Sequence, residues 1–325
     1  MISVIVPAFN VESEIANTLN SILKQTYSEI EIIVIDDGST DKTGRIIDTY
    51  ASRYKQIIAV HTQNQGVTAA RLIGIKRAAG EWIGFIDADD EIESDMYELL
   101  LKNAELYNAD ISHCGYQMVF PDGRISYFHN TGCLMQQDKI AGLKDLLDGS
   151  LIEPSLCNKL FRKTLFCGLL HNQIDKSIKI NEDLLMNYIL FSEANTAIFQ
   201  DVCKYHYLVR NTSASRKSLN QYKIFDPIRV KQIILDMNIN NMTEATMKAY
   251  IKTCINVYNS LVLDKTGQFI KEEKEIRKLI QEHKKWVSFL NGKQHFLASF
   301  ILFCPIVYKP IYRLYAKYLL KNLYE

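Results

Sequence analysis

Four acidic side chains lie within five residues in the segment Asp87-Ala88-Asp89-Asp90-Glu91. Carboxylates packed this closely repel one another unless a cation lies among them. Mg²⁺ and Mn²⁺ prefer oxygen ligands and often bind few carboxylates while bridging the phosphates of a substrate. The spacing of Asp87 and Asp89 would let both approach one complex of a nucleotide with a metal ion. A solvated acidic loop is the alternative interpretation.

A second acidic pair, Asp36-Asp37, stands directly before Gly38. Adjacent carboxylates at the exit of a buried strand cost free energy unless they are paired, hydrogen-bonded or facing a ligand. A carboxylate at this point can accept a hydrogen bond from a ribose hydroxyl or a base N–H group, and Gly38 permits a tight turn. A capping turn that binds no ligand is the alternative.

Two further segments offer groups for binding. Gly66 opens a predicted helix whose first N–H groups could bind an anion, and Arg71 follows about one turn later. An ordinary helix start with a surface arginine is the alternative. Pro7 ends an apolar run by removing a backbone donor, and Asn10 could cap the helix that follows. Taken alone, that last segment favours a strand end with a cap.

Four short apolar runs precede these segments and are predicted to be strands of one sheet. The runs span residues 2–6, 30–35, 57–61 and 82–86, and helical segments lie between them at roughly 13–25, 41–54 and 67–79. This alternation predicts βαβ units and a parallel sheet. Ligands of such sheets bind at the carboxyl ends of the strands, so the segments described above should meet at one edge.

The pattern changes beyond residue 95. The predicted elements are a helix at 95–107, paired strands at 110–120 and 124–128, helices near 138–148 and 182–194, and strands near 196–201 and 203–209. Strand patterns then stop, and helices are predicted near 219–237, 243–263, 270–290 and 294–323. We therefore predict three parts: residues 1–100, 101–215 and 216–325.

The composition argues against several classes of protein. The 38 basic and 37 acidic side chains give a formal net charge of +1, which argues against coating of nucleic acid. The seven cysteines form no C-x-x-C pair, which argues against a zinc ribbon or disulfide scaffold and indicates a reducing compartment. The first residues lack the pattern of a signal peptide, and no apolar run reaches membrane-spanning length. A cytoplasmic protein is predicted.

Taken in order, the motifs resemble the bacterial glycosyltransferase family 2, whose members have the GT-A fold. The resemblance is strongest in Val4-Ile5-Val6-Pro7-Ala8-Phe9-Asn10, Ile35-Asp36-Asp37-Gly38-Ser39-Thr40-Asp41, Asn64-Gln65-Gly66 with Ala70-Arg71, and Gly80-Glu81-Trp82-Ile83-Gly84-Phe85-Ile86-Asp87-Ala88-Asp89-Asp90. It continues more weakly through Asn158-Lys159-Leu160-Phe161-Arg162, Asn181-Glu182-Asp183-Leu184-Leu185-Met186, Tyr205-His206-Tyr207 with Arg210, and Ser213-Ala214-Ser215. It covers roughly residues 1–215 and departs from the family at Leu72, where an asparagine is usual.

The resemblance implies an α/β protein with a Rossmann-like, mostly parallel GT-A sheet and a helical C-terminal extension. It implies inverting, metal-dependent transfer of a hexose from a nucleotide-sugar, with a UDP-sugar favoured, to a saccharide acceptor. Asp183 would be the catalytic base, although an acid at the start of a helix can simply compensate the helix dipole, worth about 0.3–1 kcal/mol.

The family likeness also implies roles for other positions. Asp89, with Asp87, would hold Mn²⁺ or Mg²⁺, and Asp37 would contact the uracil or ribose. The other residues implied to line the nucleotide-sugar site are Pro7, Ala8, Asn10, Glu12, Gly66, Arg71 and Ala88. Those implied near the diphosphate or acceptor are Lys159, Arg210, Ser213 and Ser215.

The last forty residues are basic and aromatic. Six lysines and one arginine between 284 and 325 face a lone acid, Glu325, with aromatic residues interleaved. Such helices suit peripheral contact with an anionic inner membrane, which would fit a polyprenyl-diphosphate-linked acceptor for capsule, exopolysaccharide or O-antigen. A helical pair packed on the catalytic domain, with a solvated basic face, is the alternative.

Two other functions remain open, and no oligomeric state is predicted. A catalytically inactive subunit that binds a nucleotide-sugar is one. A sugar nucleotidyltransferase is the other, although the segment Pro7-Ala8-Phe9-Asn10 lacks the glycine-rich, basic loop that is usual in such enzymes.

Overall fold

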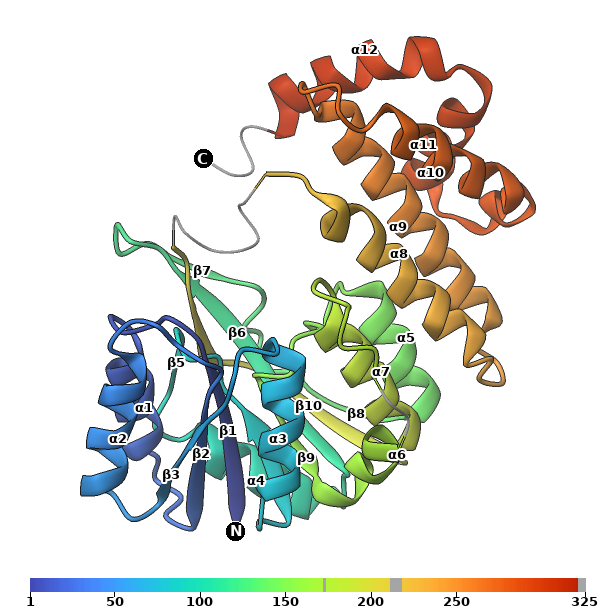
Figure 1. Ribbon diagram of the computed structural model, residues 1–325. Helices are drawn as coiled ribbons and strands as arrows, with labels where there is room; N and C mark the ends of the chain where they lie inside the picture. The colour runs from blue at the N-terminus through green and yellow to red at the C-terminus, as the bar shows by residue number, and fades with distance from the viewer. Residues whose placement is uncertain (172–173, 211–217, 321–325) are drawn as a thin grey trace. The chain divides into compact units, whose positions relative to one another are not determined.

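The computed structural model describes residues 1–171, 174–210 and 218–320. The chain forms two compact units, one of residues 1–177 and 182–216 and one of residues 178–181 and 217–325. Figure 1 shows a sheet with helices in the first unit and helices in the second. All seven cysteines are free thiols.

A mixed sheet is the core of the first unit. Within the described residues its order is β3-β2-β1-β4-β9-β6-β10-β5, with β7 beside β6 and β8 beside β10. The strands are β1 (Ile2–Ala8), β2 (Ile30–Asp36), β3 (Ile57–His61), β4 (Trp82–Phe85), β5 (Glu91–Ile92), β6 (Ile111–Val119), β7 (Ile125–Tyr127), β8 (Leu134–Asp138), β9 (Lys159–Arg162) and β10 (Thr196–Leu208).

The four strands predicted in the first hundred residues form the parallel part of this sheet. β1 pairs in parallel with β2 and β4, and β2 with β3. The register places Ala8 opposite Asp36 and Asp36 opposite His61, so these strands end together. Pro7 lies inside β1, opposite Ile35, and the strand continues one residue past the proline.

The remaining strands explain why the sheet is mixed. β9 pairs antiparallel with β4 and β6, β7 with β6, and β8 and β5 with β10, whereas β6 and β10 are parallel. The two strands predicted at 196–201 and 203–209 form one strand, β10. Its pairing with β6 shifts register between Gln200 and Cys203 and between Cys203 and Tyr205, which interrupts the alternation of side chains.

Helices cover the sheet of the first unit (Figure 1). They are α1 (Ile15–Leu23), α2 (Thr43–Arg53), α3 (Val67–Arg77), α4 (Met96–Leu106), α5 (Lys139–Asp148), α6 (Phe166–His171) and α7 (Glu182–Glu193). Since α3 and α7 begin at the edge where β1, β2 and β4 end, their first turns supply side chains to that edge.

The second unit contains helices and, among its described residues, no strand. It contains α8 (Gln221–Asp236), α9 (Thr243–Leu263), α10 (Ile270–Glu282), α11 (Gly292–Phe303) and α12 (Pro305–Tyr315), with short helices at Lys284–Phe289 and Ala316–Leu320. The buried core includes Ile251, Tyr258, Ile276, Ile301 and Tyr308.

Two helices predicted in this unit are shorter than expected. The helix predicted at 294–323 is two helices, because Pro305 has no N–H group to continue α11 and instead begins α12. The helix predicted at 270–290 ends at Glu282. No helix among the described residues is long and apolar enough to cross a bilayer.

Candidate active site

A pocket of about 310 Å³ lies where β1 and β2 end. Its lining residues are Pro7, Ala8, Phe9, Asp37, Asn64, Gly66, Val67 and Ala70. Four of the residues implied by the family resemblance, Pro7, Ala8, Asp37 and Gly66, therefore share one pocket. Phe9, which is 46% exposed, was not singled out from the sequence. The available signal was an aromatic residue two positions after Pro7, where the first strand was predicted to end.

Asp37 fixes the shape of this pocket from within. Its two carboxylate oxygens accept hydrogen bonds from the N–H groups of Gln65 (2.9 Å) and Gly66 (2.7 Å), and the side chain is buried. The Gly66 N–H, which was predicted from the sequence to bind an anion, thus donates to the Asp37 carboxylate. Gly38 has a φ of +75°, and a Cβ there would lie 2.7 Å from the Asn64 nitrogen. Only glycine fits that turn.

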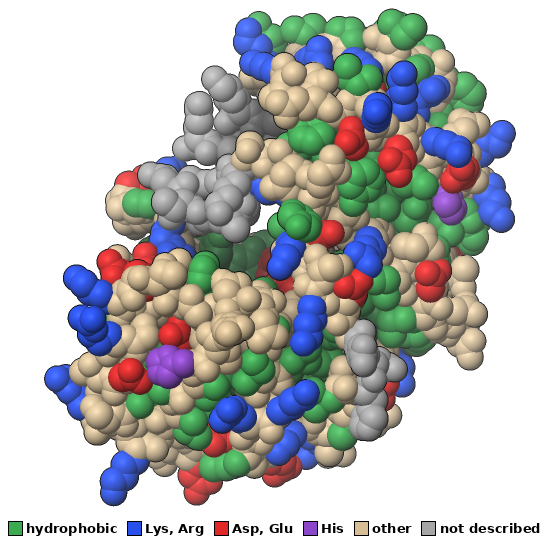
Figure 2. Space-filling model, in the orientation of Figure 1, with side chains coloured by type: hydrophobic (Ala, Val, Ile, Leu, Met, Phe, Trp, Pro, Cys, Tyr) green, Lys and Arg blue, Asp and Glu red, His purple; other side chains and the backbone are tan. Residues whose placement is uncertain are grey.

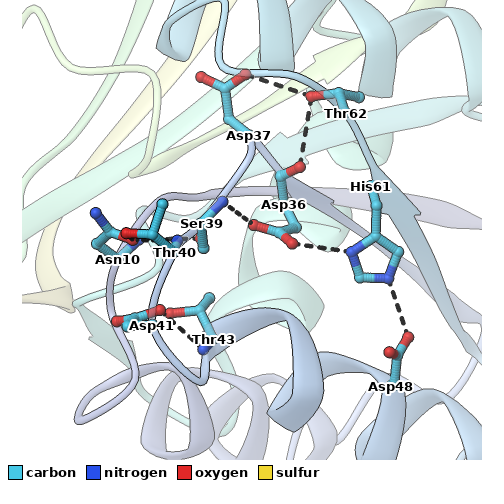
Figure 3. A network of polar contacts seen from close by, with 10 residues as sticks. All are labelled: Asn10, Asp36, Asp37, Ser39, Thr40, Asp41, Thr43, Asp48, His61 and Thr62. Atoms are coloured by element: carbon cyan, nitrogen blue, oxygen red, sulfur yellow. Dashed lines mark hydrogen bonds and ion pairs between the residues drawn. The ribbon is translucent and has the colours of Figure 1, made fainter.

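Asp36 belongs to a second set of contacts, which Figure 3 shows. Its carboxylate is 2.9 Å from His61 Nδ1 and accepts from the Ser39 N–H, and His61 Nε2 is 3.0 Å from Asp48. Hydrogen bonds to Asp36 and Asp48 raise the pKa of His61. Burial opposes ionisation of Asp36, but hydrogen bonds from Ser39 and His61 outweigh it and lower the pKa of Asp36.

Asn10 and Glu12 join the loop after β1 to the turn before α2. Asn10 Oδ1 accepts from the Thr40 N–H and a Glu12 carboxylate oxygen accepts from the Lys42 N–H, both at 2.8 Å. The structure thus places these two side chains against a backbone turn and not among the lining residues of the pocket. α1 begins at Ile15, so Asn10 does not cap it.

Arg71 connects two distant segments at the same edge of the sheet. Its guanidinium lies 3.2 Å from Asp87, which follows β4, and 3.2 Å from Glu182, which begins α7. The side chain is buried. Burial opposes its charge, but Asp87 and the neighbouring acids outweigh burial and hold the pKa of Arg71 above its usual value.

Asp183 follows Glu182 in the first turn of α7. Its carboxylate accepts a 2.8 Å hydrogen bond from the Leu184 N–H, and burial raises its pKa. Burial and the neighbouring Asp183 raise the pKa of Glu182 to about 7. These two carboxylates therefore accept protons more readily than ordinary acids. Glu182 was quoted in the motif but was not assigned a role, and its contact with Arg71 could not be read from spacing.

Asp89 contacts the guanidinium of Arg210, which also lies 3.0 Å from Glu14. Over the residues that the structure describes, no group of three or more His, Cys, Asp or Glu side chains is arranged to hold a metal ion. The side chains of Asp87 and Asp89 are 38% and 31% exposed, however. Their hard oxygen donors fit a Mg²⁺ or Mn²⁺ ion whose other ligands come from substrate and water.

Asp90 is the buried member of the acidic segment. Its carboxylate oxygens accept from the Tyr205 hydroxyl at 2.7 Å and from the Leu208 N–H at 2.9 Å. Burial and the charge of Asp87 raise the pKa of Asp90 to about 7. The carbonyl of Ala88 accepts from the Thr18 hydroxyl at 2.9 Å. These three hydrogen bonds hold the acidic segment against neighbouring elements.

Residues 3–169 match the family model described as glycosyl transferase family 2. The chain belongs to this family. It is 35% identical to the uncharacterized glycosyltransferase EpsJ of Bacillus subtilis over 212 residues, which cover 64% of this chain and 60% of EpsJ. It is 32% identical to the glycosyltransferase GlyA of Streptococcus pneumoniae serotype 4 over 223 residues, covering 66% of this chain and 31% of GlyA.

The fold is similar to a solved structure in the GT-A class. S. aureus TarS 1–349, crystallised in complex with UDP-GlcNAc, superposes with a TM-score of 0.77 at 19% identity, covering 97% of this chain and 91% of that one. A similarity at this identity shows the fold, an α/β GT-A sheet flanked by helices with a helical C-terminal part.

Lys159, implied to lie near the diphosphate or acceptor, contacts a loop of the protein instead. Lys159 is fully buried, and its ammonium donates to the carbonyls of Glu153 and Ser155 and to the Asn158 side chain at 2.6–2.8 Å. Burial lowers the pKa of Lys159 to about 8. Its contacts support the loop before β9. Ser213 and Ser215 lie outside the described residues.

Proposed function

We propose that this family 2 member is an inverting glycosyltransferase that moves a hexose from a UDP-sugar to a saccharide acceptor. The observation that carries the proposal is the buried Arg71, which holds Asp87 and Glu182 at one edge of the sheet. This contact places the acidic segment after β4 near the carboxylates of α7. Ala70, its neighbour in α3, lines the pocket after β1.

The pocket suits a nucleotide base. The exposed ring of Phe9 can stack on a flat heterocycle. Asp37 Oδ1 already accepts from Gln65 and Thr62, but Oδ2, which accepts from the Gly66 N–H, has a further lone pair for a base N–H or ribose hydroxyl. The similar fold of TarS, solved in complex with UDP-GlcNAc, favours a uridine nucleotide.

Asp183 is proposed as the general base. The acceptor hydroxyl oxygen attacks the anomeric carbon and forms the new glycosidic bond, while the bond from that carbon to the diphosphate oxygen breaks. The electron pair leaves with the nucleoside diphosphate, and the hydroxyl proton passes to Asp183. A single displacement inverts the anomeric centre. The raised pKa of Asp183 suits a proton acceptor.

Asp89 and Asp87 would hold the divalent cation. When bound, Mn²⁺ or Mg²⁺ would act as a Lewis acid that stabilises the charge on the leaving diphosphate. Arg210 contacts Asp89 and supplies a positive side chain at the same place. It can neutralise Asp89 in the free protein and bind phosphate oxygens when the donor is present.

The acceptor is proposed to be a saccharide carried on a polyprenyl diphosphate, used at the cytoplasmic face of the inner membrane. Capsule, exopolysaccharide and O-antigen synthesis need such transfers. Support for this acceptor is the family resemblance together with the basic, aromatic C-terminal helices, and the resemblance alone supports the pathway.

A thermal-shift panel of UDP, GDP, CDP and dTDP, each with Mn²⁺ and with EDTA, tests donor class and metal together. A ligand at 100 times its dissociation constant stabilises by about 2.7 kcal/mol, enough for a shift of a few degrees. We expect a UDP-selective shift that EDTA removes. No shift with any nucleotide contradicts the donor assignment, and an equal shift in EDTA contradicts the metal. Release of UDP from UDP-sugars in the presence of acceptor separates an enzyme from an inactive binding subunit.

A further inference from the structure

The second unit carries an apolar surface on the outer side of its last helices. We name the outer ridge by its six exposed members: Phe303, Ile306, Val307, Ile311, Leu314 and Tyr318. Phe303 and Ile306 are 83% and 86% exposed, and the other four are 48–63% exposed. In a water-soluble helix such residues normally face the core, so their exposure requires an explanation.

Four ridge members lie on one side of α12 and of the short helix after it, and Phe303 and Ile306 lie where α11 meets α12. Val307, Ile311, Leu314 and Tyr318 follow the spacing of one side of a helix. The opposite side faces the core, where Tyr308 is buried and its ring stacks on Tyr312 at 5.5 Å. α12 thus has two apolar sides, one of which lacks a protein partner among the described residues.

The charged side chains of residues 283–320 have one sign. Residues 283–320 contain six Lys or Arg side chains and no Asp or Glu. Lys309 pairs with Glu273 at 2.6 Å, and Arg313 donates to the Val262 carbonyl. Lys293 and Lys317 have no acidic partner among the described residues, and they lie against the rings of Tyr315 and Tyr318. Figure 2 shows hydrophobic and basic side chains together over α12.

We propose that the outer ridge is a membrane-binding surface, with the ridge side chains inserted among acyl chains and the lysines on anionic headgroups. Apolar insertion and attraction of basic side chains to anionic lipid are the two contributions that bind an interfacial helix. A second copy of the chain fits less well. A two-fold contact would place the same lysines against each other, with no acidic residue in 283–320 to pair with them.

This surface deepens the proposed function, since it would hold the enzyme where a lipid-linked acceptor is found. The link to the acceptor rests on the proposed function, whereas membrane binding itself does not. The surface also differs from a spanning segment, because no described helix is long and apolar enough to cross a bilayer. Binding is therefore expected to be peripheral and sensitive to salt.

Co-sedimentation of the full chain with lipid vesicles tests the proposal. The probes are vesicles of phosphatidylcholine alone and vesicles that also contain phosphatidylglycerol. We expect the wild type to bind the anionic vesicles roughly tenfold or more tightly than the neutral ones. The double variant Ile306→Ser/Leu314→Ser should lose roughly tenfold or more of that binding, since two inserted side chains become polar. Lys293→Gln/Lys317→Gln should weaken binding to anionic vesicles and reduce its salt dependence.

Ile270→Ser is the matched control, because Ile270 is 59% exposed at the start of α10 in the same unit and lies outside the ridge. It should bind vesicles as the wild type does. Each variant is also tested for its UDP thermal shift, so that loss of vesicle binding with an intact shift cannot come from unfolding. Equal sedimentation of the ridge variant and the wild type overturns the proposal. The proposal is also overturned if the wild type is a dimer and the ridge variant is a monomer. Absence of a UDP shift in the wild type contradicts the donor assignment and leaves the ridge untouched.

Discussion

Two acidic segments lie at the same edge of the sheet and are stabilised in different ways. After β2, the carboxylate of Asp36 contacts His61 and a backbone N–H group, and the carboxylate of Asp37 accepts from two backbone N–H groups. These N–H groups belong to the loops after β2 and β3. After β4, Asp87 and Asp89 contact the guanidinium groups of Arg71 and Arg210.

The difference separates a fixed part of the site from an adjustable one. Backbone N–H groups cannot leave their carboxylates without unfolding a loop, so the first segment sets the shape of the pocket. Arginine side chains can exchange one anion for another, so the second segment can rearrange when a diphosphate or a cation arrives. Asp90 and Glu182, whose carboxyl pKa values are raised to about 7 mainly by burial, also lie at the second segment.

Removal of the proposed base should have the largest effect. Asp183→Asn keeps the shape of the side chain but cannot accept the proton, so transfer should fall by about 10²–10⁴-fold while UDP binding persists. Transfer and the UDP thermal shift are measured on the same preparation. Glu193→Gln, at the exposed end of the same helix, serves as the control. Wild-type turnover in Asp183→Asn would place the base elsewhere.

The adjustable character of the second segment is tested by Asp89→Asn. This change removes a charge that a divalent cation needs, so the Mn²⁺-dependent part of UDP binding should disappear while the fold remains. Titration of UDP with Mn²⁺ and with EDTA measures it, and Asp122→Asn in the exposed turn after β6 is the control. Equal UDP–Mn²⁺ affinity in Asp89→Asn and wild type would refute the metal assignment.

The buried Asp90 gives a prediction about pH. Its folded pKa is raised to about 7, above the ordinary value near 4, so the folded protein binds this proton more tightly than the unfolded chain. The contribution of Asp90 to the free energy of unfolding should therefore decrease as pH rises from about 4 to 7 and stay low above that. Asp90→Asn should remove this component. Urea unfolding of both proteins at pH 5 to 8 measures the difference, and parallel profiles would contradict the buried carboxyl.

The smallest effect is expected in the first segment. His61→Gln removes contacts with Asp36 and with the exposed Asp48, worth about 0.2–1 kcal/mol at a site this accessible. Because the folded pKa of His61 is raised, the loss should be full below the ordinary pKa near 6.5 and should vanish as pH rises through the raised value. Unfolding curves at several pH values report it. A loss that grows with pH would contradict the charged pairing.

The local part of this site was predictable and the long-range part was not. The strands of the parallel half follow from apolar runs, and the family motifs identify the residues that share the pocket after β1. Asn10 and Glu12 accept hydrogen bonds from the backbone of the turn before α2, and a motif does not show which backbone groups a side chain contacts. Arg71 and Glu182 are 111 positions apart and Tyr205 and Asp90 are 115 apart, so their contacts follow from the sheet order.

Short elements escaped prediction for a different reason. β5 has two residues and β9 has four, too few to show any periodicity, yet β9 joins β4 to β6 and β5 is paired with the segment that carries Tyr205. By contrast, the break at Pro305 could have been predicted, because Pro305 lies inside the helix expected at 294–323 and a proline has no N–H group to continue a helix.

The crowding at Gly38 limits how the proposed donor preference could be redesigned. Variants with any other residue at position 38 would be strained. Their Cβ would clash with the backbone of Asn64, and the φ angle disfavours every residue except glycine. Diversity is better placed at Phe9 and Val67, which line the same pocket and are 46% and 36% exposed. The directed evolution of a new nucleotide preference would start from those two positions.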